Sequence, residues 1–566
     1  MNKKNIFRDL LLALTALVPC LICLLFVNSS AVSILFLDEW EMVSFCAKMD
    51  VHDITFADLF AQHNEHRIFF MYFAYLGLIS VSGFNVIVPM WFSFAMILLL
   101  DFIILRYIAS RSGVSDKRKY FFAALTSFLL FSLTQYENLL WGFQIGFVMV
   151  LFFSVLSGYF LCQMFHATCK TRRNIYFIVA LLAAIIDSFS SSQGLITWVT
   201  GLVLFFMMFR KKTFSSPYFI VWTLVAIATW IAYFHNYVKP EHHPSLFYLF
   251  EHPGMFLQYF FSITGNAISG TLKAGNVVIG ILLLLFLFIA CVKIWKNKQV
   301  QQFIFPLALA LNSLFILGSI AIGRVGLGVE QALASRYTTF SICLVVGVAL
   351  LWMELKDKAK NKTIIKNMAK LFVVIILISI PLTMTEGLQN GKKIKTDRVY
   401  SAYILETANM QPDQFLQRFY PWPDSVRTRV TYLEQKKWSV FHRPQYAVPE
   451  ILYNDSLAVA NNEVLQFAQN TLKFAPDFMV VVRPTVHPKY KNDVKALYAD
   501  IDGQVFPLYY KPEFNNRPPN PASIYDISAI SNRVLSKGVH SIKFKALRND
   551  RTGYYLINPG WAFEVK

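Results

Sequence analysis

Long hydrophobic runs recur along the first 385 residues of the chain, and short polar segments separate them. A helix needs about 20 mostly apolar residues to cross a bilayer, so these runs predict transmembrane helices. The predicted spans lie near residues 10–27, 84–107, 120–135, 144–165, 175–190, 195–209, 216–234, 276–294, 302–322, 337–354 and 366–385. The pattern therefore predicts a polytopic α-helical membrane protein with about 11 spans.

A shorter apolar segment, residues 68–81, breaks the regular alternation of sides if it crosses the membrane completely. We expect a short interfacial or re-entrant helix there. The sequence SVSGFN at 80–85 is equally typical of a hairpin turn, so the crossing of 68–81 is left open.

Hydrophobicity falls after residue 385, and residues 386–566 are predicted to form a separate soluble domain. A proline at the start and an apolar periodicity predict a helix within 421–441. Segments rich in β-branched and aromatic residues predict strands within 477–484, 504–511, 540–547 and 552–565. The expected architecture is a membrane domain, 1–385, followed by an α+β, β-sandwich-like domain.

The positive charge of the chain supports one orientation in the membrane. The formal net charge is +19, and many basic residues cluster between predicted spans, at 106–119, 170–173, 210–212, 293–298 and 356–362. Such loops remain in the cytoplasm, so we expect the amino terminus inside and the carboxyl-terminal domain outside. Anionic membrane lipid is an expected partner. Nucleic acid is not, because no nucleic-acid-binding motif accompanies the charge.

In this orientation the unusual polar motifs all lie on the outer side. Asp38, Glu39 and Glu41 stand in the first outer loop, 30–67. On a helix Asp38 and Glu39 diverge by about 100°, whereas Glu41 shares the face of Asp38. A solvated loop start is the alternative interpretation of these carboxylates.

The segment AQHNEHR places four more polar residues in the same loop: His63, Glu65, His66 and Arg67. On a helix the two histidines would be neighbours and could share a divalent metal with a carboxylate. A hydrogen-bonding cluster for a polar substrate is the competing interpretation, and Arg67 could instead extend to the interface. The seven cysteines provide no zinc-ligand spacing. No cofactor is therefore assigned, and a divalent metal is left open.

Two further outer segments carry amides and carboxylates beside aromatic residues. QYENLLWGFQ contains Glu137, Asn138, Trp141 and Gln144, and DSFSSSQG contains Gln193. Polar groups at membrane depth are costly unless they face protein or a water-filled cavity. Aromatic rings next to such groups suit the faces and hydroxyls of a sugar.

The segment GRVGLGVEQALASRY, residues 323–337, indicates a phosphate site. Arg324 and Arg336 flank a glycine-rich turn, and Glu330 and Tyr337 lie within or beside it. Guanidinium groups and exposed backbone amides bind phosphate oxygens. The alternative is that both arginines only anchor their helices among lipid headgroups.

Taken together, these segments resemble the GT-C superfamily of integral membrane glycosyltransferases, which includes the protein O-mannosyltransferases and serotype-converting O-antigen glucosyltransferases. The resemblance lies in FLDEW, QHNEHR, ENLLWGFQ and GRVGLGVEQALASRY. It also lies in the layout, with an acidic first outer loop, many spans and an outward carboxyl-terminal domain.

The resemblance implies a polyprenyl-phosphate sugar donor and a glycolipid or glycan acceptor, such as O-antigen or lipopolysaccharide. The reaction would take place at the periplasmic face of a bacterial inner membrane. Asp38 would be the general base, with Glu39 as the alternative, and Arg324 and Arg336 would bind the donor phosphate. Residues expected to line the sugar and acceptor pocket are Glu41, His63, Glu65, His66, Arg67, Glu137, Asn138, Trp141, Gln144, Gln193, Glu330 and Tyr337.

Other functions fit part of the same pattern. An O-antigen polymerase or ligase would share the lipid phosphate and the outward arginines. A transporter or flippase of lipid-linked saccharide would place polar residues through the whole depth of the bilayer. A non-enzymatic envelope scaffold would not need the Glu-Asn and arginine groups. The outer clustering of polar motifs favours an enzyme.

Overall fold

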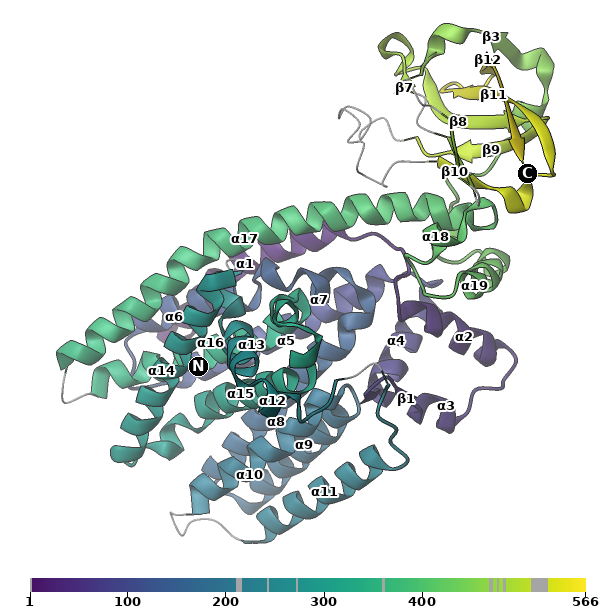
Figure 1. Cartoon of the computed structure of the whole chain (residues 1–566). Coiled ribbons are helices and arrows are strands. Elements are labelled where there is room, and N and C mark those ends of the chain that lie inside the picture. Colours follow the sequence, from purple (N-terminus) through teal and green to yellow (C-terminus); the bar gives the residue numbers. More distant parts are fainter. Residues whose placement is uncertain are drawn as a thin grey trace. The chain divides into compact units, whose positions relative to one another are not determined.

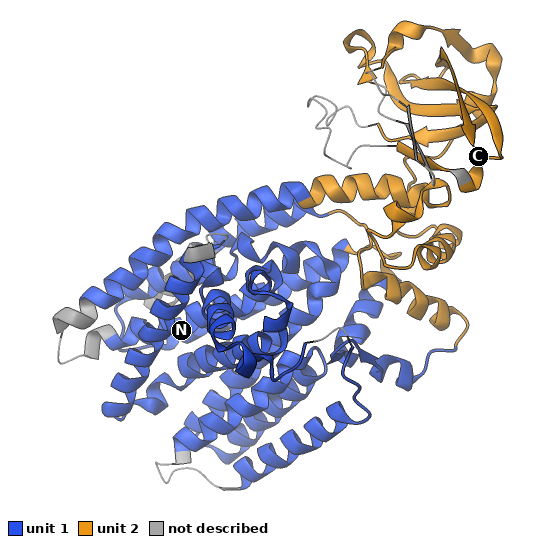
Figure 2. Cartoon of the chain, in the orientation of Figure 1, with its two compact units in different colours: residues 1–31, 53–79, 87–393 blue, residues 32–52, 80–86, 394–566 orange. Residues whose placement is uncertain are grey.

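The structure is a computed structural model that describes residues 3–209, 216–241, 244–270, 273–358, 362–467, 472–475, 478–481, 485–510 and 528–565. The chain folds into two compact units (Figure 2). Unit 1 comprises residues 1–31, 53–79 and 87–393, and unit 2 comprises residues 32–52, 80–86 and 394–566. The first outer loop is thus divided between the units, because 32–52 belongs to the unit that also contains the carboxyl-terminal residues.

Unit 1 is a bundle of helices (Figure 1). Its helices are α1 (Lys3–Ser30), α3 (Phe56–Phe60), α4 (Phe69–Val81), α5 (Ile87–Ser110), α6 (Asp116–Leu130), α7 (Tyr136–Leu140), α8 (Ile145–His166), α9 (Lys170–Ser188), α10 (Ile196–Phe209), α11 (Ser216–Phe234), α12 (Tyr248–Glu251), α13 (Pro253–Ser269), α14 (Lys273–Lys296), α15 (Ile304–Arg324), α16 (Ser335–Lys358) and α17 (Lys362–Glu406), whose last turns enter unit 2. Every predicted span coincides with one of these helices.

Seven helical segments among the described residues are long and apolar enough to cross a membrane. They are Ile87–Ser110, Gly142–His166, Pro217–Phe234, Gly275–Lys296, Val300–Leu327, Ser335–Leu355 and Asn367–Glu406. The helices at the other predicted spans are shorter in their apolar part or begin with charged residues, as α6 does with Asp116 and Lys117. These helices are compatible with a multi-pass membrane protein, while the count of about 11 spans stays a prediction.

The apolar segment 68–81 forms α4, so the predicted short helix is confirmed. Its 13 residues extend for about 20 Å, less than the roughly 30 Å hydrocarbon core. The chain then turns through Gly83 and Phe84, which have φ of 64° and 59°. Whether α4 crosses the membrane stays a prediction.

A helix that the sequence did not indicate, α13, occupies the long segment before α14 that was predicted to lie outside. Close approach explains how α13 packs: a Cβ on Gly265 would lie 2.1 Å from the Asn276 oxygen, and one on Gly280 would lie 2.0 Å from the Phe261 oxygen. Asn266 also donates to the Thr338 hydroxyl over 2.9 Å. These contacts hold α13 against α14 and the first turns of α16.

Unit 2 contains α2 (Glu39–Asp50), α18 (Asp413–Leu416), α19 (Pro423–Lys436) and several small sheets. The largest sheet has the order β3-β12-β11-β8-β9, built from Ala458–Ala460, Tyr554–Val565, Gly538–Arg548, Val494–Ile501 and Gln504–Leu508. A second sheet has the order β10-β6-β5, built from Ser528–Ser531, Phe478–Val481 and Leu472–Ala475, and β4 (Leu465–Gln466) pairs with β7 (Thr485–Val486).

The carboxyl-terminal sheet region agrees with the sequence prediction. The predicted helix is α19, and the predicted strands are β6, β9, β11 and β12, apart from residues 477, 482–484 and 511, which lie outside the described residues. Ile530 of β10 belongs to the same buried hydrophobic cluster as Phe506 and Phe544 of the five-stranded sheet. The two sheets therefore share a core, as a sandwich-like domain requires.

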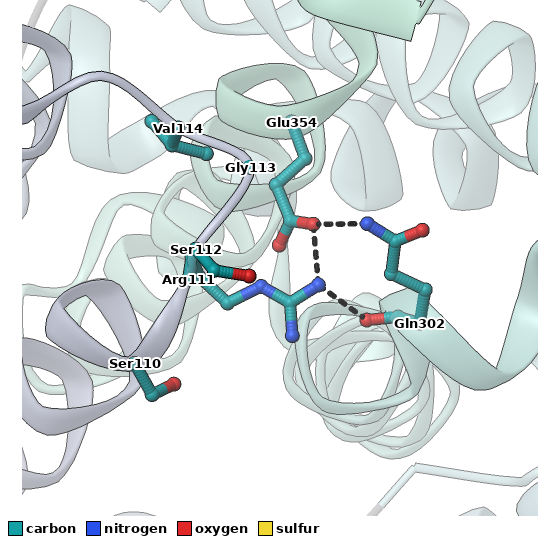
Figure 3. Close-up of a pocket in the computed structure, with 7 residues that line it drawn as sticks. All are labelled: Ser110, Arg111, Ser112, Gly113, Val114, Gln302 and Glu354. Atoms are coloured by element: carbon teal, nitrogen blue, oxygen red, sulfur yellow. Dashed lines mark hydrogen bonds and ion pairs between the residues drawn. The ribbon is translucent and has the colours of Figure 1, made fainter.

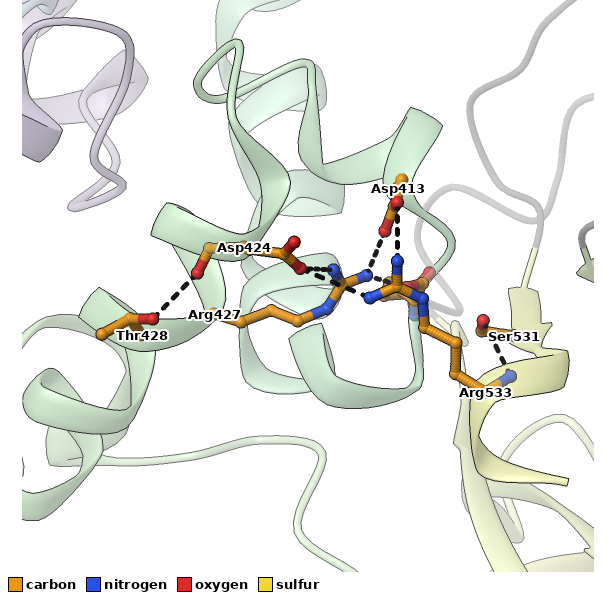
Figure 4. A network of polar contacts seen from close by, with 7 residues as sticks. Asp413, Asp424, Arg427, Thr428, Ser531 and Arg533 are labelled. Carbon is orange, nitrogen blue, oxygen red and sulfur yellow. Dashed lines mark hydrogen bonds and ion pairs between the residues drawn. The ribbon is translucent and has the colours of Figure 1, made fainter.

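Charged side chains connect the short helices of unit 2 to the end of β10. Arg427 binds Asp413 over 2.7 Å and Asp424 over 2.9 Å, and Arg533 binds the same carboxylates over 3.0 and 3.3 Å (Figure 4). The Arg427 and Arg533 hydrogen bonds lower the pKa of Asp424. This network fixes the first turn of α19 relative to α18 and the sheet.

The amino-terminal part of unit 2 packs on the segment between α18 and α19. The Leu37 amide donates to the Phe419 carbonyl over 2.9 Å, and Trp40 is fully buried, with its ring centroid 6.4 Å from that of Phe419. The predicted acidic motif is consequently held by residues almost 400 positions away in sequence.

Candidate functional site

A charged cluster in unit 1 brings together three residues of the predicted site. The Arg324 guanidinium, at the carboxyl end of α15, pairs with Glu65, and the same Glu65 oxygen lies 3.2 Å from His66 Nε2. The side chains are partly exposed, at 24% for Arg324, 16% for Glu65 and 15% for His66. They remain accessible to a ligand.

Backbone contacts fix the orientation of the His66 ring. The Ser192 amide donates to His66 Nδ1 over 3.2 Å, so Nδ1 accepts and Nε2 carries the hydrogen that faces Glu65. Gln193 lies beside this contact, because its Oε1 accepts a hydrogen bond of 2.5 Å from Ser191. Gln193 is thus connected to His66 only through Ser191, whose hydroxyl lies 3.4 Å from His66 Nδ1. Its role in binding a sugar stays a prediction.

The two histidines stand on a hairpin and not on a helix. β1 (Gln62–His63) pairs with β2 (His66–Arg67), and His63 and His66 face each other across the hairpin. The helical arrangement considered from their spacing is therefore wrong, because Asn64 turns the chain with φ of 49°. Within the described residues no group of three or more His, Cys, Asp or Glu side chains could hold a metal ion.

The contacts of His63 and Arg67 indicate that both residues have structural roles. His63 is buried, with its ring 6.1 Å from Tyr72 and 5.5 Å from Phe143. Arg67 is also buried, and it donates to the carbonyls of Tyr233 over 2.6 Å and Phe60 over 2.7 Å, and to that of His235. A cation at the carboxyl end of α11 offsets the helix dipole. Arg67 therefore orients the hairpin that carries Glu65 and His66.

The second predicted arginine lies at the start of α16 with Glu137 and Asn138. The Glu137 carboxylate accepts the Arg336 amide over 3.2 Å, which stabilises the first turn of α16. Asn138 is fully buried and donates to the Arg336 carbonyl over 2.9 Å and the Thr339 hydroxyl over 2.6 Å. Glu137 and Asn138 thus position the backbone of Arg336.

The Arg336 guanidinium forms no ion pair with any residue in the described part of the chain. It lies 5.4 Å from the centre of the Tyr337 ring. Its charge lies near those of Glu137 and Arg324. The Arg336 guanidinium can therefore form paired hydrogen bonds with an added anion without first breaking an ion pair.

The remaining predicted residues of unit 1 take several environments. Gln144 and Trp141 are buried around η2 (Gly142–Gln144), and no described group hydrogen-bonds the Gln144 Oε1. Tyr337 is buried at 3% exposure against Phe147. Glu330 is exposed in the turn between α15 and α16, where Gly328 has φ of 100°.

The three acidic residues of the first loop lie in unit 2 and differ in their burial and in their contacts. Asp38 is half-buried at the amino-terminal cap of α2. Glu39 is 1% exposed, accepts the Phe36 amide over 2.9 Å and interacts with the charge of Arg398, whose guanidinium lies 3.9 Å from the Phe36 ring. Glu41 accepts a hydrogen bond of 3.2 Å from Tyr420. Asp38 is therefore the more accessible of the two proposed bases.

One charged group of unit 1 was not predicted. Glu354 accepts hydrogen bonds from Tyr107 over 2.7 Å, Arg111 over 2.6 Å and Gln302 over 3.1 Å, beside a pocket of ≈ 300 Å³ (Figure 3). The sequence grouped Arg111 with the basic loop residues and gave Glu354 no role. The available signal was an acid, Glu354, at the end of the apolar run that precedes Lys356.

Comparison of the chain with protein families, curated proteins and solved structures finds no match. The functional conclusion therefore rests on the residues of this chain and on the geometry of the two arginine-containing groups.

Proposed function

We propose that the protein is a membrane glycosyltransferase of the GT-C type. It transfers a sugar from a polyprenyl-phosphate donor to a cell-envelope acceptor, O-antigen, lipopolysaccharide or a related glycan, at the periplasmic face of a bacterial inner membrane. The proposal assigns donor phosphate binding to Arg324 and Arg336 and proton acceptance to Asp38.

The pair of arginines at the ends of α15 and α16 is the observation that carries the proposal. Arg324 ends the apolar helix α15, Arg336 lies in the first turn of the apolar helix α16, and Arg336 has no ion-pair partner among the described residues. A lipid phosphate would pair with the Arg336 guanidinium at the end of an apolar span. Guanidinium groups bind phosphate with paired, charge-assisted hydrogen bonds.

The proposed reaction needs only a base, charge stabilisation and positioning. The acceptor hydroxyl attacks the anomeric carbon, its proton passes to Asp38, and the bond from the anomeric carbon to the phosphate oxygen breaks. The electron pair leaves with the lipid phosphate, where the arginines offset the developing charge. No nucleotide-binding motif is required, because the lipid phosphate is already a leaving group.

Two environments in the structure support the choice of side chains. Glu39 is buried and occupied by the Phe36 amide, which favours Asp38 as the base. Glu65 and His66 present carboxylate and imidazole groups next to Arg324, a set suited to sugar hydroxyls.

The direct test is transfer of radiolabelled sugar by purified protein in lipid nanodiscs. Synthetic polyprenyl-phosphate sugars are the donors and extracted envelope glycolipid is the acceptor. Label in the glycolipid, absent with heat-inactivated protein, is the expected result. Transfer only from diphosphate-linked donors would instead indicate a polymerase or ligase, and no transfer from any donor would contradict the proposal.

A further inference from the structure

Unit 2 contains a groove between α2 and α19, with a volume of ≈ 500 Å³. α2 contributes Val43, Ser44, Ala47 and Lys48, and α19 contributes Asp424, Ser425, Thr428, Arg429 and Tyr432. We call it the α2–α19 groove. It starts about 7.5 Å along the helix axis from Asp38, because Val43 follows Asp38 by five residues.

Polar contacts hold the two walls of the groove together. Arg429 donates to the Ser44 hydroxyl over 3.1 Å, and at the far end Tyr432 and Lys436 each bind Asp50 over 2.7 Å. On its other side, α19 is held by the Arg427 and Arg533 network (Figure 4). The groove is therefore preformed, which reduces the conformational entropy that a ligand must overcome on binding.

The lining of the groove combines apolar surface with hydroxyl groups. Val43 and Ala47 supply aliphatic surface, and Tyr432 supplies an aromatic ring. Ser425 makes no hydrogen bond within the described residues, and Ser44 accepts from Arg429 and keeps its own hydrogen for donation. A sugar ring has an apolar C–H face and a rim of hydroxyls, so this lining suits a saccharide.

The charges around the groove favour an anionic saccharide. Arg429 and Lys48 are the two basic residues among those that line the groove. Asp424 is the acidic member of the lining, and its carboxylate is neutralised by Arg427 and Arg533. The residues that line the groove thus include two bases and one acid, a formal excess of positive charge that favours a phosphate or carboxylate on the ligand.

We propose that the α2–α19 groove binds the acceptor glycan through a segment that bears a phosphate or carboxylate. This inference rests on the proposed glycosyltransferase function and names the acceptor class. The helix that begins at the proposed base would thereby also hold the molecule whose hydroxyl attacks the donor sugar.

A matched pair of threonines on α19 permits a specific test. Thr428 lines the groove and Thr431 does not, yet both are exposed and both donate to the backbone carbonyl four residues earlier, over 3.0 and 3.1 Å. Thr428→Trp fills the groove, whereas Thr431→Trp places the same side chain elsewhere on the helix. Calorimetry on full-length protein in nanodiscs measures binding of deacylated, phosphorylated lipopolysaccharide core oligosaccharide.

We expect wild type and Thr431→Trp to bind the oligosaccharide alike and Thr428→Trp to bind at least about tenfold more weakly. Lys48→Gln, and enzymatic removal of the phosphates from the probe, should each weaken binding severalfold. A carboxylate-bearing oligosaccharide without phosphate distinguishes the two anionic groups. No binding by wild type, or equal binding by both Trp variants, would overturn the inference.

A transfer assay with the same variants separates this inference from the proposed function. Unchanged acceptor KM in Thr428→Trp would overturn the groove assignment and leave the glycosyltransferase standing. Groove-dependent binding of the oligosaccharide without transfer by wild type would contradict the transferase and leave a glycan-binding groove.

Discussion

Two Arg–Glu pairs at opposite ends of α15 have the same chemistry and different surroundings. Arg111–Glu354 lies beside Gln302, before α15 begins, and Arg324–Glu65 lies where α15 ends, about 30 Å along the helix. Glu354 is 2% exposed and receives three donors, whereas Glu65 is 16% exposed and shares one oxygen between Arg324 and His66. The Glu354 carboxylate is fully hydrogen-bonded and holds helices together, while the Arg324–Glu65 pair retains capacity to bind a ligand.

The largest expected effect is a loss of activity when Arg336, one of the two arginines proposed to bind the donor phosphate, is changed. Arg336→Gln should lower the transfer rate by about 10²–10³-fold, because one donor to the developing phosphate charge is lost. Its thermal stability should change little, since the Arg336 guanidinium forms no ion pair within the described residues. Radiolabel transfer in nanodiscs measures the rate, and Arg172→Gln, an exposed basic residue outside both groups, is the control. Equal activity in both variants would contradict the assignment.

The Arg111–Glu354 pair should affect stability more than activity. Arg111→Met should reduce the free energy of unfolding by about 3 kcal/mol, because it leaves the Glu354 carboxylate buried without its cation. Unfolding in mixed micelles measures the change, and the double variant Arg111→Met/Glu354→Met should recover part of it. A loss of transfer without a loss of stability would show that this pair also has a functional role.

Changing the Glu65 carboxylate tests whether it is a counter-ion that phosphate displaces. Glu65→Gln removes the negative charge that competes for Arg324, so inorganic phosphate should bind severalfold more tightly. Calorimetry with the full-length protein measures this affinity. Weaker phosphate binding would mean that Glu65 orients Arg324 and does not compete with the ligand.

The smallest effect concerns the His540–Asp502 pair in the sheet region, in which the His540 side chain is 8% exposed and that of Asp502 is 47% exposed. The Ser536 carbonyl and then Asp502 raise the pKa of His540, and the Ser541 amide and then His540 lower the pKa of Asp502. The stabilisation by His540 is complete below its unfolded pKa of about 6.5 and is lost as the pH rises through the raised folded pKa. That of Asp502 is complete above about pH 3.9 and is lost as the pH falls through the lowered folded pKa.

His540→Gln should therefore lower Tm by about 2 °C near pH 6 and by less near pH 8.5. Differential scanning fluorimetry at both pH values measures the difference, with His487→Gln, which lies in a turn outside this pair, as control. A Tm difference that grows with pH would contradict the stated direction of the His540 shift.

Most of the fold followed from hydrophobic runs, because an apolar stretch of sufficient length has few alternatives to a helix. α13 was not foreseen, since its polar residues and glycines are explained only by close packing on α14 and α16. The division of the first outer loop between two units was also unforeseen. The contact of Leu37 with Phe419 joins residues too distant in sequence for any local pattern to reveal.

The candidate site was predicted by residue type more successfully than by geometry. Glu65 contacts both Arg324 and His66 in the structure, whereas the helical spacing assumed for His63 and His66 does not occur. Arg67 looked like a ligand-binding or interfacial residue and instead binds backbone carbonyls. Sequence cannot reveal such partners, because carbonyl acceptors are common to every residue.

The proposal that Asp38 is the base of a glycosyltransferase is tested most directly by comparing Asp38→Asn with wild type in sugar transfer from a polyprenyl-phosphate donor. Asp53→Asn, which changes an exposed acid of the same loop, is the matched control. Donor binding and Tm are measured for each protein. We expect Asp38→Asn to bind donor, to unfold at the wild-type temperature and to transfer no detectable sugar. Asp53→Asn should remain active. Full transfer by a folded Asp38→Asn protein would contradict the assignment of Asp38 as the base.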